Sequence, residues 1–307
     1  MGDSARALEH YNRAREMSEG LLATDRANPA YRRALSVAYE HIGTLLLLTG
    51  DLDSALAHNR RALELRAALA AEFPLNADYG RTHVVSYYND GEILAKMSRR
   101  REALDSYRKS LSLAERLSWQ DPNNEQYRGD VAYALIRVGD MLVALGDPQR
   151  ALVSYQKSRT LRERDVNADP TNLWKRSSLI EARAKMTKAL AIGRQYQAAL
   201  AASAETQALM AHTRLDPTNA NFRGFFADTY IDLGAAHALL ARERGTTPGE
   251  RRDRWRAART WYQQSLEIWQ DLQGRGTLAA TDRPKLESVA GEIARCDRML
   301  AESHSSR

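Results

Sequence analysis

The sequence repeats itself about every 48 residues, and this repeat restricts the possible fold more than any other feature. An acid–proline–amide segment occurs as DPNNEQY at 121–127 and returns as DPTNLW at 169–174 and DPTNANF at 216–222, with a looser copy, FPLNADY, at 73–79. The aromatic residues used to align the units are Tyr31, Tyr79, Tyr127, Trp174 and Phe222, at intervals of 48, 48, 47 and 48 residues. A fixed period of this kind is typical of an array of stacked structural units.

Each unit is expected to be a pair of helices. Val131, Leu135 and Val138 recur at three- and four-residue spacing, which predicts an amphipathic helix over about 124–145. The chain has only 8 prolines and 17 glycines, and Ala, Leu, Arg and Glu dominate, as is typical of helical proteins. Small residues keep the same register in the units, with glycine at Gly43, Gly91, Gly139 and Gly234 and alanine at Ala55, Ala103, Ala151 and Ala198. We expect these small residues to lie where two helix backbones approach closely.

The helix pairs carry a pattern that is known from other proteins. The first helices contain YEHIG at 39–43, YYNDG at 87–91 and YIDLG at 230–234, and the second helices contain ALDSY at 103–107 and ALVSY at 151–155. This pattern resembles the tetratricopeptide repeat, TPR. The resemblance implies an all-α protein, an α-solenoid of about five and a half antiparallel helix-pair repeats. Such a solenoid is a right-handed superhelix, closed here by a C-terminal capping helix.

The period differs from that of the TPR, which is usually about 34 residues. The surplus of about 14 residues divides between the two helices, and seven residues are about two helical turns. Both helices are therefore expected to be about 20 residues long.

The register gives the expected repeat boundaries within one continuous solenoid domain. Residue 1 falls in mid-repeat, because the segment from Gly2 to Ala7 matches the segment from Gly50 to Ala55. The spacing from Gly234 to Ala258 is 24 residues where other units use 12, which indicates an insertion. The expected segments are a half repeat at 1–27, repeats at 28–75, 76–123, 124–171, 172–218 (degenerate) and 219–275 with the insertion 242–253, and the capping helix at 276–303.

The charge, the apolar runs and the single cysteine limit the class of protein to which this chain can belong. The net charge of +6 comes from 45 basic and 39 acidic residues that are mixed along the chain, as on solvated helix faces. No run approaches the roughly 20 apolar residues needed to cross a membrane, and no signal peptide is apparent, so the sequence predicts a soluble, cytoplasmic protein. Its single cysteine, Cys296, excludes an internal disulfide and a thiolate metal cluster, and is expected to be a small core residue.

The sequence contains no recognisable catalytic motif. The segment 245–249 is rich in glycine but lacks the Gly-Lys-Ser/Thr ending of a phosphate-binding loop. No His-Glu-x-x-His motif occurs, and the seven histidines do not have metal-ligand spacing. We therefore expect a non-enzymatic protein with no catalytic residue, cofactor or metal ion.

The TPR resemblance also implies a partner-binding groove, lined by the first helices of successive repeats. In the family, the lining positions lie three and two residues before the conserved glycine and one and five after it. Carried over, the groove residues are Glu40, His41, Thr44, Tyr88, Asn89, Glu92, Lys96, Arg137, Asp140, Arg183, Thr187 and Asp232. Tyrosine and arginine are frequent in interface hot spots. The alternative is that these residues only form a polar helix face.

Two arginine clusters form a second candidate surface. The first cluster is Arg99, Arg100 and Arg101, and the second is Arg251, Arg252 and Arg254. Arginine forms bidentate hydrogen bonds with phosphate and carboxylate groups, so both clusters are candidates for contact with phosphate or an acidic partner. Arginines exposed to solvent at turns explain the pattern equally simply.

The expected function is a protein–protein interaction scaffold that binds a peptide or a partner protein in the groove. The tail segments 268–272 and 293–297, taken with the long repeat, also resemble the C-terminal repeat region of certain bacterial serine/threonine protein kinases. This narrower resemblance implies a kinase domain upstream in the same natural chain, in line with the mid-repeat start. The alternatives are a nucleic-acid-binding helical-repeat protein, favoured by the pI near 9.4 and the arginines, and more remotely a hydrolase.

Overall fold

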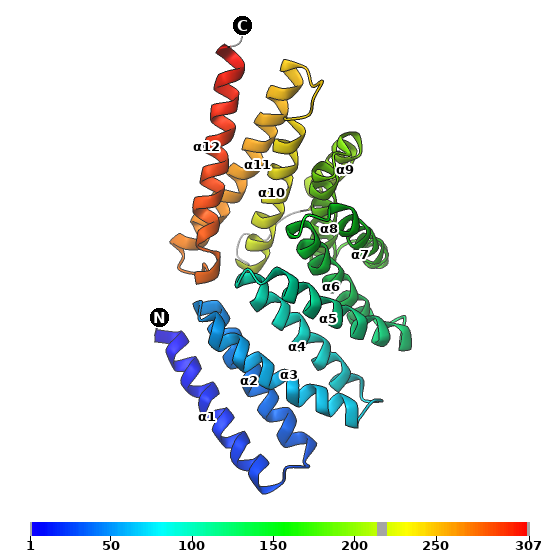
Figure 1. Cartoon of the computed structure of the whole chain (residues 1–307), viewed down its shortest axis with the longest axis vertical. Coiled ribbons are helices and arrows are strands. Elements are labelled where there is room, and N and C mark those ends of the chain that lie inside the picture. Colours follow the sequence, from blue (N-terminus) through cyan, green and yellow to red (C-terminus); the bar gives the residue numbers. More distant parts are fainter. Residues whose placement is uncertain (1, 214–219, 306–307) are drawn as a thin grey trace. The chain divides into compact units, whose positions relative to one another are not determined.

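The computed structural model describes residues 2–213 and 220–305, and every regular element in these ranges is a helix (Figure 1). The chain divides into two compact units, Met1–Leu145 and Gly146–Arg307. The expected boundary between segments 172–218 and 219–275 falls on residues outside the described part of the chain.

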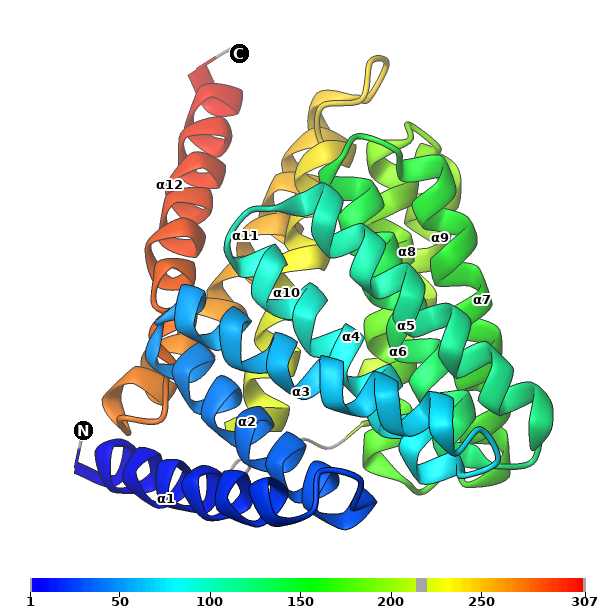
Figure 2. The same cartoon turned by 60° about the horizontal axis from the view of Figure 1, so that its bottom comes forward.

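The first unit is a stack of helices in which each helix packs against the next. Its helices are α1 Gly2–Thr24, α2 Pro29–Thr49, α3 Leu52–Glu72, α4 Ala77–Lys96, α5 Arg100–Gln120 and α6 Glu125–Ala144. Neighbours along the chain run in opposite directions, and α4 also contacts α6 (Figures 1 and 2). Between α2 and α6 each helix has 20 or 21 residues, the length expected from the sequence.

The second unit is built in the same way. Its helices are α7 Pro148–Ala168, α8 Leu173–Ile192, α9 Tyr196–Ala211, α10 Ala220–Leu240, α11 Pro248–Gly274, the short 3₁₀ helix η1 Ala280–Asp282 and α12 Pro284–Ser305. Helix α8 packs against α7, α9 and α10, and α11 packs against α10 and α12. The expected insertion, 242–253, spans most of the connection between α10 and α11 and the first turns of α11, which has 27 residues.

The repeated asparagines begin the first helix of each pair. Asn28, Asn76, Asn124 and Asn172 are the N-caps of α2, α4, α6 and α8, and each side chain accepts a hydrogen bond from a backbone N–H in the first turn. An N-cap of this kind stabilises a helix by about 1 kcal/mol, because it satisfies an N–H that lacks an intrahelical partner. The segments at 73–79, 121–127 and 169–174 are thus helix boundaries, whereas the asparagine of the copy at 216–222 lies outside the described residues.

The second helices begin in different ways. Asp51 and Asp147 cap α3 and α7 through their side chains. The turn before α5 differs, because Ser98 has a φ of 61° and the N-cap Arg99 makes no side-chain cap hydrogen bond. In the second unit, Thr247 and Glu250 form a reciprocal capping box at the start of α11.

Two of the repeated glycines lie directly against an aromatic ring of the paired helix. A Cβ atom on Gly91 would lie 2.6–2.9 Å from atoms of the Tyr107 ring, and one on Gly234 would lie 2.8–3.0 Å from the Tyr262 ring. Both tyrosine rings are buried. The glycine therefore gives the aromatic ring of the next helix a place to pack.

The last helices share a core of their own. Trp255 and Trp269 of α11 are buried against Val289 and Ile293 of α12. Cys296 is fully buried in the same cluster, as expected for a small core residue. Helix α12 therefore covers an apolar face of α11.

The close approach at Gly91 can be tested by adding one methyl group. Gly91→Ala is expected to lower the free energy of unfolding by about 1–3 kcal/mol, because the new Cβ overlaps the Tyr107 ring. Gly129→Ala is the matched control: Gly129 lies inside α6 with no atom within 4 Å of its Cβ position, so alanine should stabilise the helix by about 0.5–1 kcal/mol. Urea unfolding measures both changes, and equal effects would contradict the packing described.

Candidate partner-binding surface

Nine of the predicted groove residues lie on alternate helices of the first unit. We call them the α2–α4–α6 surface: Glu40, His41, Thr44, Tyr88, Asn89, Glu92, Lys96, Arg137 and Asp140. They come from the first helices of successive pairs, which lie within side-chain contact of one another. Asn89 of α4 donates a hydrogen bond to Glu40 of α2 over 3.4 Å, and Arg81 of α4 donates two, of 2.8 and 3.2 Å, to Asp130 of α6.

Arg137 is the centre of a polar cluster on this surface. Its guanidinium donates to the Tyr88 hydroxyl over 3.1 Å and lies 3.0 Å from a carboxylate oxygen of Glu92. It also donates to Asp140 over 3.2 Å. Four of the predicted residues thus lie together, with Tyr88 and Glu92 on α4 and Arg137 and Asp140 on α6.

A buried tyrosine of α5, Tyr107, contacts two residues of this cluster. The Tyr107 hydroxyl donates a hydrogen bond to Glu92, and its ring packs edge-on against Tyr88 with the centroids 5.8 Å apart. Burial raises the pKa of Tyr107 strongly, and the Glu92 charge raises it further, so the phenol stays protonated and acts as a donor. The sequence analysis singled out Tyr107 only as the last residue of the repeated motif ALDSY.

A second buried residue, which the sequence analysis missed, holds the other end of the surface. Arg66 of α3 has a side chain only 3% exposed and forms an ion pair with Glu40. Its guanidinium also donates to the Ser86 hydroxyl over 3.0 Å. The signal for a buried arginine was present, because Arg66 lies on the helical stripe that contains Ala62 and Leu69.

The other residues of the surface are exposed. Thr44 and Lys96 are both exposed. His41 is exposed on one side and stacks on Tyr11 of α1, with the ring centroids 4.9 Å apart. His41 and Tyr11 line a hollow of about 610 Å³ that also contains Val37 and Ala34 of α2. An apolar depression therefore lies beside the charged part of the surface.

The second unit corrects part of the prediction. Thr187 is fully buried and donates its hydroxyl to the backbone of Arg183, so the prediction that it lines an exposed groove is wrong. Arg183 pairs with Glu163 over 2.9 Å and lies 3.6 Å from Glu205. Thr187 differs from expectation because α7 and α9 flank α8 and cover part of its surface. Arg183 is half-buried, and its role in binding stays a prediction.

Asp232 is also buried rather than exposed. Its carboxylate lies 2.7 Å from the ammonium of Lys188 and 3.3 Å from that of Lys185, both on α8. Burial acts to raise the pKa of Asp232, but the two ammonium groups outweigh it and lower the pKa from 3.8 to about 2. Asp232 therefore joins α10 to α8 and does not face a ligand.

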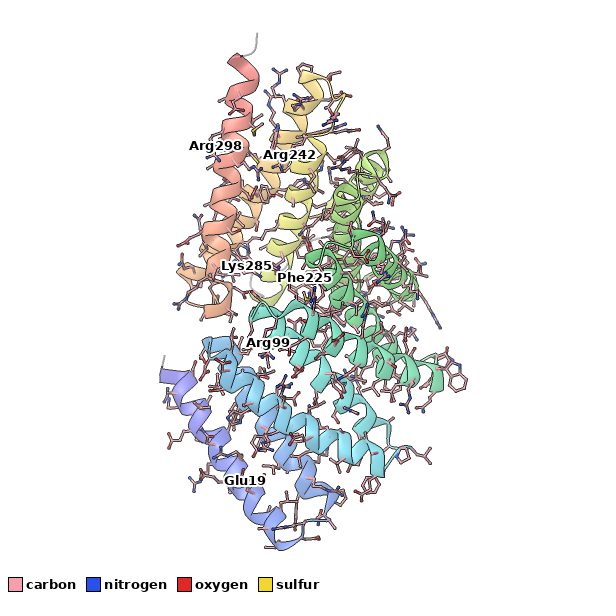
Figure 3. All side chains as sticks on the ribbon, in the orientation of Figure 1. Glu19, Arg99, Phe225, Arg242, Lys285 and Arg298 are labelled. Atoms are coloured by element: carbon pink, nitrogen blue, oxygen red, sulfur yellow. The ribbon has the colours of Figure 1, made fainter. Side chains whose placement is uncertain are left out.

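The two arginine clusters differ in accessibility. Arg99, at the start of α5 in Figure 3, forms a bidentate ion pair with Glu102. Arg254 is largely buried and donates to the carbonyl of Leu240 and to Glu243, each over 2.7 Å, so it holds the turn before α11 and is not part of an exposed anion-binding patch. Of the remaining arginines in the two clusters, three are exposed, namely Arg100, Arg101 and Arg251. Arg252 is half-buried.

Among the described residues, no helix is both long and apolar enough to span a membrane. Within the same ranges, no three His, Cys, Asp or Glu side chains are grouped as ligands of a metal ion.

Comparison with known proteins identifies the fold. No protein-family model matches the sequence, and no curated protein matches it. Among solved structures, BtubC (BKLC) from P. vanneervenii is similar with a TM-score of 0.59 and 16% identity, over 88% of this chain and 92% of that one. The apo form of RapI is similar with a TM-score of 0.52 and 12% identity, over 95% of this chain and 89% of that one.

A third solved structure is YrrB, described as a TPR protein with an unusual peptide-binding site. It has a TM-score of 0.41 and 19% identity, over 84% of this chain and 95% of that one. The structure itself consists of successive helix pairs, and BtubC and RapI share this fold with TM-scores of 0.59 and 0.52. The predicted all-α solenoid of TPR-like helix pairs is therefore confirmed.

The buried pair beneath the α2–α4–α6 surface gives a stability prediction. Glu40→Ala is expected to lower the free energy of unfolding by about 3 kcal/mol, because it leaves the Arg66 guanidinium buried without its carboxylate. Adding Arg66→Met to this variant should recover part of the loss, since no charge then remains buried. Urea unfolding of the two single variants and the double variant measures the coupling, and strictly additive losses would contradict a direct pair.

Asp232 gives a pH prediction. Because its pKa is lower in the folded chain than its usual 3.8, its ionised form stabilises the fold fully above about pH 4, and this stabilisation is lost as the pH falls toward 2. Between pH 4 and 2, the wild type should lose about 2 kcal/mol more stability than Asp232→Asn. Asp105→Asn, at an exposed position of α5, is the control and should follow the wild type. Urea unfolding across this pH range tests the difference.

Proposed function

We propose that this protein is a non-catalytic scaffold that binds a peptide segment or a partner protein on the α2–α4–α6 surface. The observation that carries the proposal is the cluster around Arg137. It places an arginine, a tyrosine and two carboxylates on neighbouring helices of the α2–α4–α6 surface. His41 of the same surface lines the hollow together with Tyr11. Tyrosine and arginine are the residue types most often found in interface hot spots.

The contacts within this cluster also favour binding energetically. Arg137 and Tyr88 are already held by hydrogen bonds, and Glu92 receives one from buried Tyr107. Immobilising a free side chain on binding costs about 0.5–1.5 kcal/mol, so side chains ordered in advance reduce the cost of forming a complex. Most of the entropic cost of binding would then come from ordering the extended peptide, which is flexible before it binds.

The narrower proposal is that the chain is the sensor or recruitment arm of a bacterial serine/threonine kinase, working in the cytoplasm. It rests on the resemblance of the long repeats and tail segments to the C-terminal repeats of such kinases. The genomic neighbourhood tests it: a kinase reading frame fused upstream of residue 1 is the expected result. An unrelated upstream region would count against the kinase link but would leave the binding scaffold intact.

Nucleic-acid binding is the less favoured function. Arg254 is taken up by the turn before α11, and Arg99 is paired with Glu102, which leaves fewer arginines for phosphate contacts. Gel shifts at low and physiological salt separate the two functions. Binding that is sequence-blind and disappears at physiological salt would be general electrostatic attraction.

The partner-binding surface is tested by changing Tyr88 and Arg137 to alanine together. Each truncated hot-spot residue costs about 1–2 kcal/mol, so the double variant should bind specific partners at least about 30-fold more weakly. Partners are first isolated from native lysate with the wild type, and affinities are then measured with the purified partner. The control changes Arg108 and Lys157, which are exposed on α5 and α7. If the double variant keeps every specific partner, the surface assignment is wrong.

A further inference from the structure

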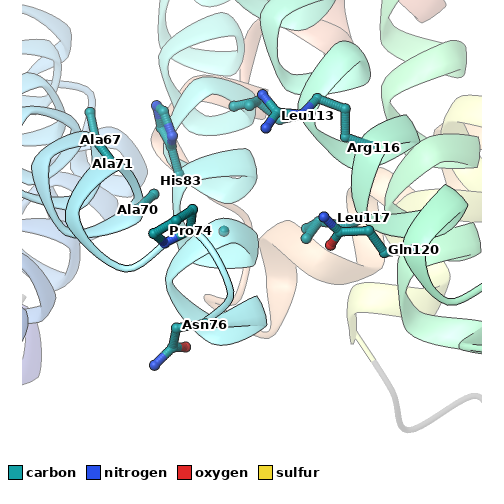
Figure 4. Close-up of a pocket in the computed structure, with 11 residues that line it drawn as sticks. Ala67, Ala70, Ala71, Pro74, Asn76, His83, Leu113, Arg116, Leu117 and Gln120 are labelled. Atoms are coloured by element: carbon teal, nitrogen blue, oxygen red, sulfur yellow. The ribbon is translucent and has the colours of Figure 1, made fainter.

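A cavity of about 290 Å³ lies away from the proposed partner-binding residues, between α3, α4 and α5 of the first unit. Figure 4 shows alanines of α3 on one side of the cavity and Leu113, Arg116 and Leu117 of α5 on the other. His83 extends from α4 between these two walls. The full lining is Ala67, Ala70, Ala71, Pro74, Asn76, Gly80, His83, Leu113, Arg116, Leu117 and Gln120.

The cavity lies where α4 lacks an arginine that α2, α6 and α8 possess. Four residues after each asparagine N-cap, at the position whose N–H donates to the cap carbonyl, α2, α6 and α8 have Arg32, Arg128 and Arg176. In α4 the same position, four residues after Asn76, is Gly80. The same backbone hydrogen bond in all four helices therefore shows that Gly80 and the three arginines occupy equivalent positions, independently of the sequence alignment.

The three arginines use this position to bind groups at helix ends. Arg32 pairs with Glu72 over 2.7 Å and donates to the carbonyl of Ala27. Arg128 donates to the carbonyl of Pro122, and Arg176 to that of His212. Gly80 has no side chain to do this, so the space beside it is left open and bordered by Leu117.

A second substitution in the same helix places a polar group in the opening. Seven residues after the N-cap, the other three helices have Leu35, Val131 and Leu179, all buried in the core. In α4 this residue is His83, whose Nε2 is buried and has no hydrogen-bond partner among the described residues. A buried polar atom without a partner costs about 1–3 kcal/mol, unless a ligand or water satisfies it.

The charge of the cavity is one-sided. No carboxylate belongs to its lining, and Arg116 has no ion-pair partner in the described part of the chain. Burial lowers the pKa of His83, and the nearby Arg116 charge lowers it further. The imidazole is therefore neutral at pH 7 and can donate one hydrogen bond, while Arg116 supplies the positive charge.

We propose that this cavity binds a carboxylate attached to a compact apolar group. The carboxylate would accept hydrogen bonds from Arg116 and from Nε2 of His83, and the apolar group would lie against the alanines of α3 and Leu113 and Leu117 of α5. At about 30 Å³ per atom, the volume accommodates roughly ten non-hydrogen atoms. Two sources have this chemistry: a free short-chain acid, and the C-terminal residue of a peptide.

The test is an NMR titration of the isotope-labelled full chain with three probes. These are 3-methylbutanoate, a short peptide that ends in leucine with a free carboxylate, and the same peptide with an amidated C-terminus. Saturable shifts of the Gly80 amide, the His83 ring and the Leu113 and Leu117 methyl groups are expected with at least one carboxylate probe. Response to the free acid alone or to the peptide alone identifies the source. Equal response to the amidated peptide, or no localised shift, overturns the proposal.

Variants separate the site from general charge effects. Arg116→Gln should weaken binding about tenfold or more, because hydrogen bonds to charged groups are the strong ones. Arg108→Gln, which removes an exposed charge two turns earlier on α5, should leave binding unchanged. Equal affinity of the Arg116 and Arg108 variants contradicts the site.

Filling the cavity is the complementary test. Gly80→Arg restores the residue found in the other three helices and should abolish binding. Its Cβ would lie 3.1 Å from a methyl carbon of Leu117, so this variant requires a small shift of that side chain. Ala70→Leu fills the cavity from the α3 side and leaves Gly80 unchanged, and this variant should also abolish binding. Binding that survives in a folded Ala70→Leu protein places the ligand elsewhere.

Discussion

The close approach between paired helices is the constraint on which both units depend. The Tyr107 ring packs against Gly91, and the Tyr262 ring packs against Gly234. A residue with a side chain at either glycine would push the two helices of the pair apart. Because this contact fixes the distance between the two helices of a pair, it also fixes where the first helices present their outer side chains. The partner-binding surface is therefore a consequence of how the pairs pack.

The surface is also joined to the core by hydrogen bonds. Arg66 lies beneath Glu40, and Tyr107 lies beneath Glu92. The carboxylates of Glu40 and Glu92 are thus each held by a buried donor on the second helix of a pair. A substitution chosen to alter binding at Glu40 or Glu92 will change stability as well, and binding data on such variants require a parallel measurement of folding.

Local features of the fold could be predicted from the sequence, whereas features that depend on neighbouring helices could not. The asparagine caps and the helix lengths follow from short-range rules, and the repeat register alone assigns Tyr88, Glu92, Arg137 and Asp140 to the first helices of their pairs. That these residues bind a partner stays a prediction. Thr187 and Asp232 were misplaced, because burial on α8 and α10 depends on which helices flank them. The cavity was missed although its signal was present: Gly80 interrupts a series of arginines.

The spacing of the contacts between neighbouring first helices has a consequence for folding kinetics. Arg137 and Tyr88 are 49 residues apart, as are Arg81 and Asp130, so these cross-helix links join only adjacent repeats. Proteins dominated by contacts of short sequence separation pay little loop-closure entropy and fold quickly. Folding of such a stack can start at any pair and spread to its neighbours. Damage to one pair should then unfold that part of the stack first, and leave distant pairs intact.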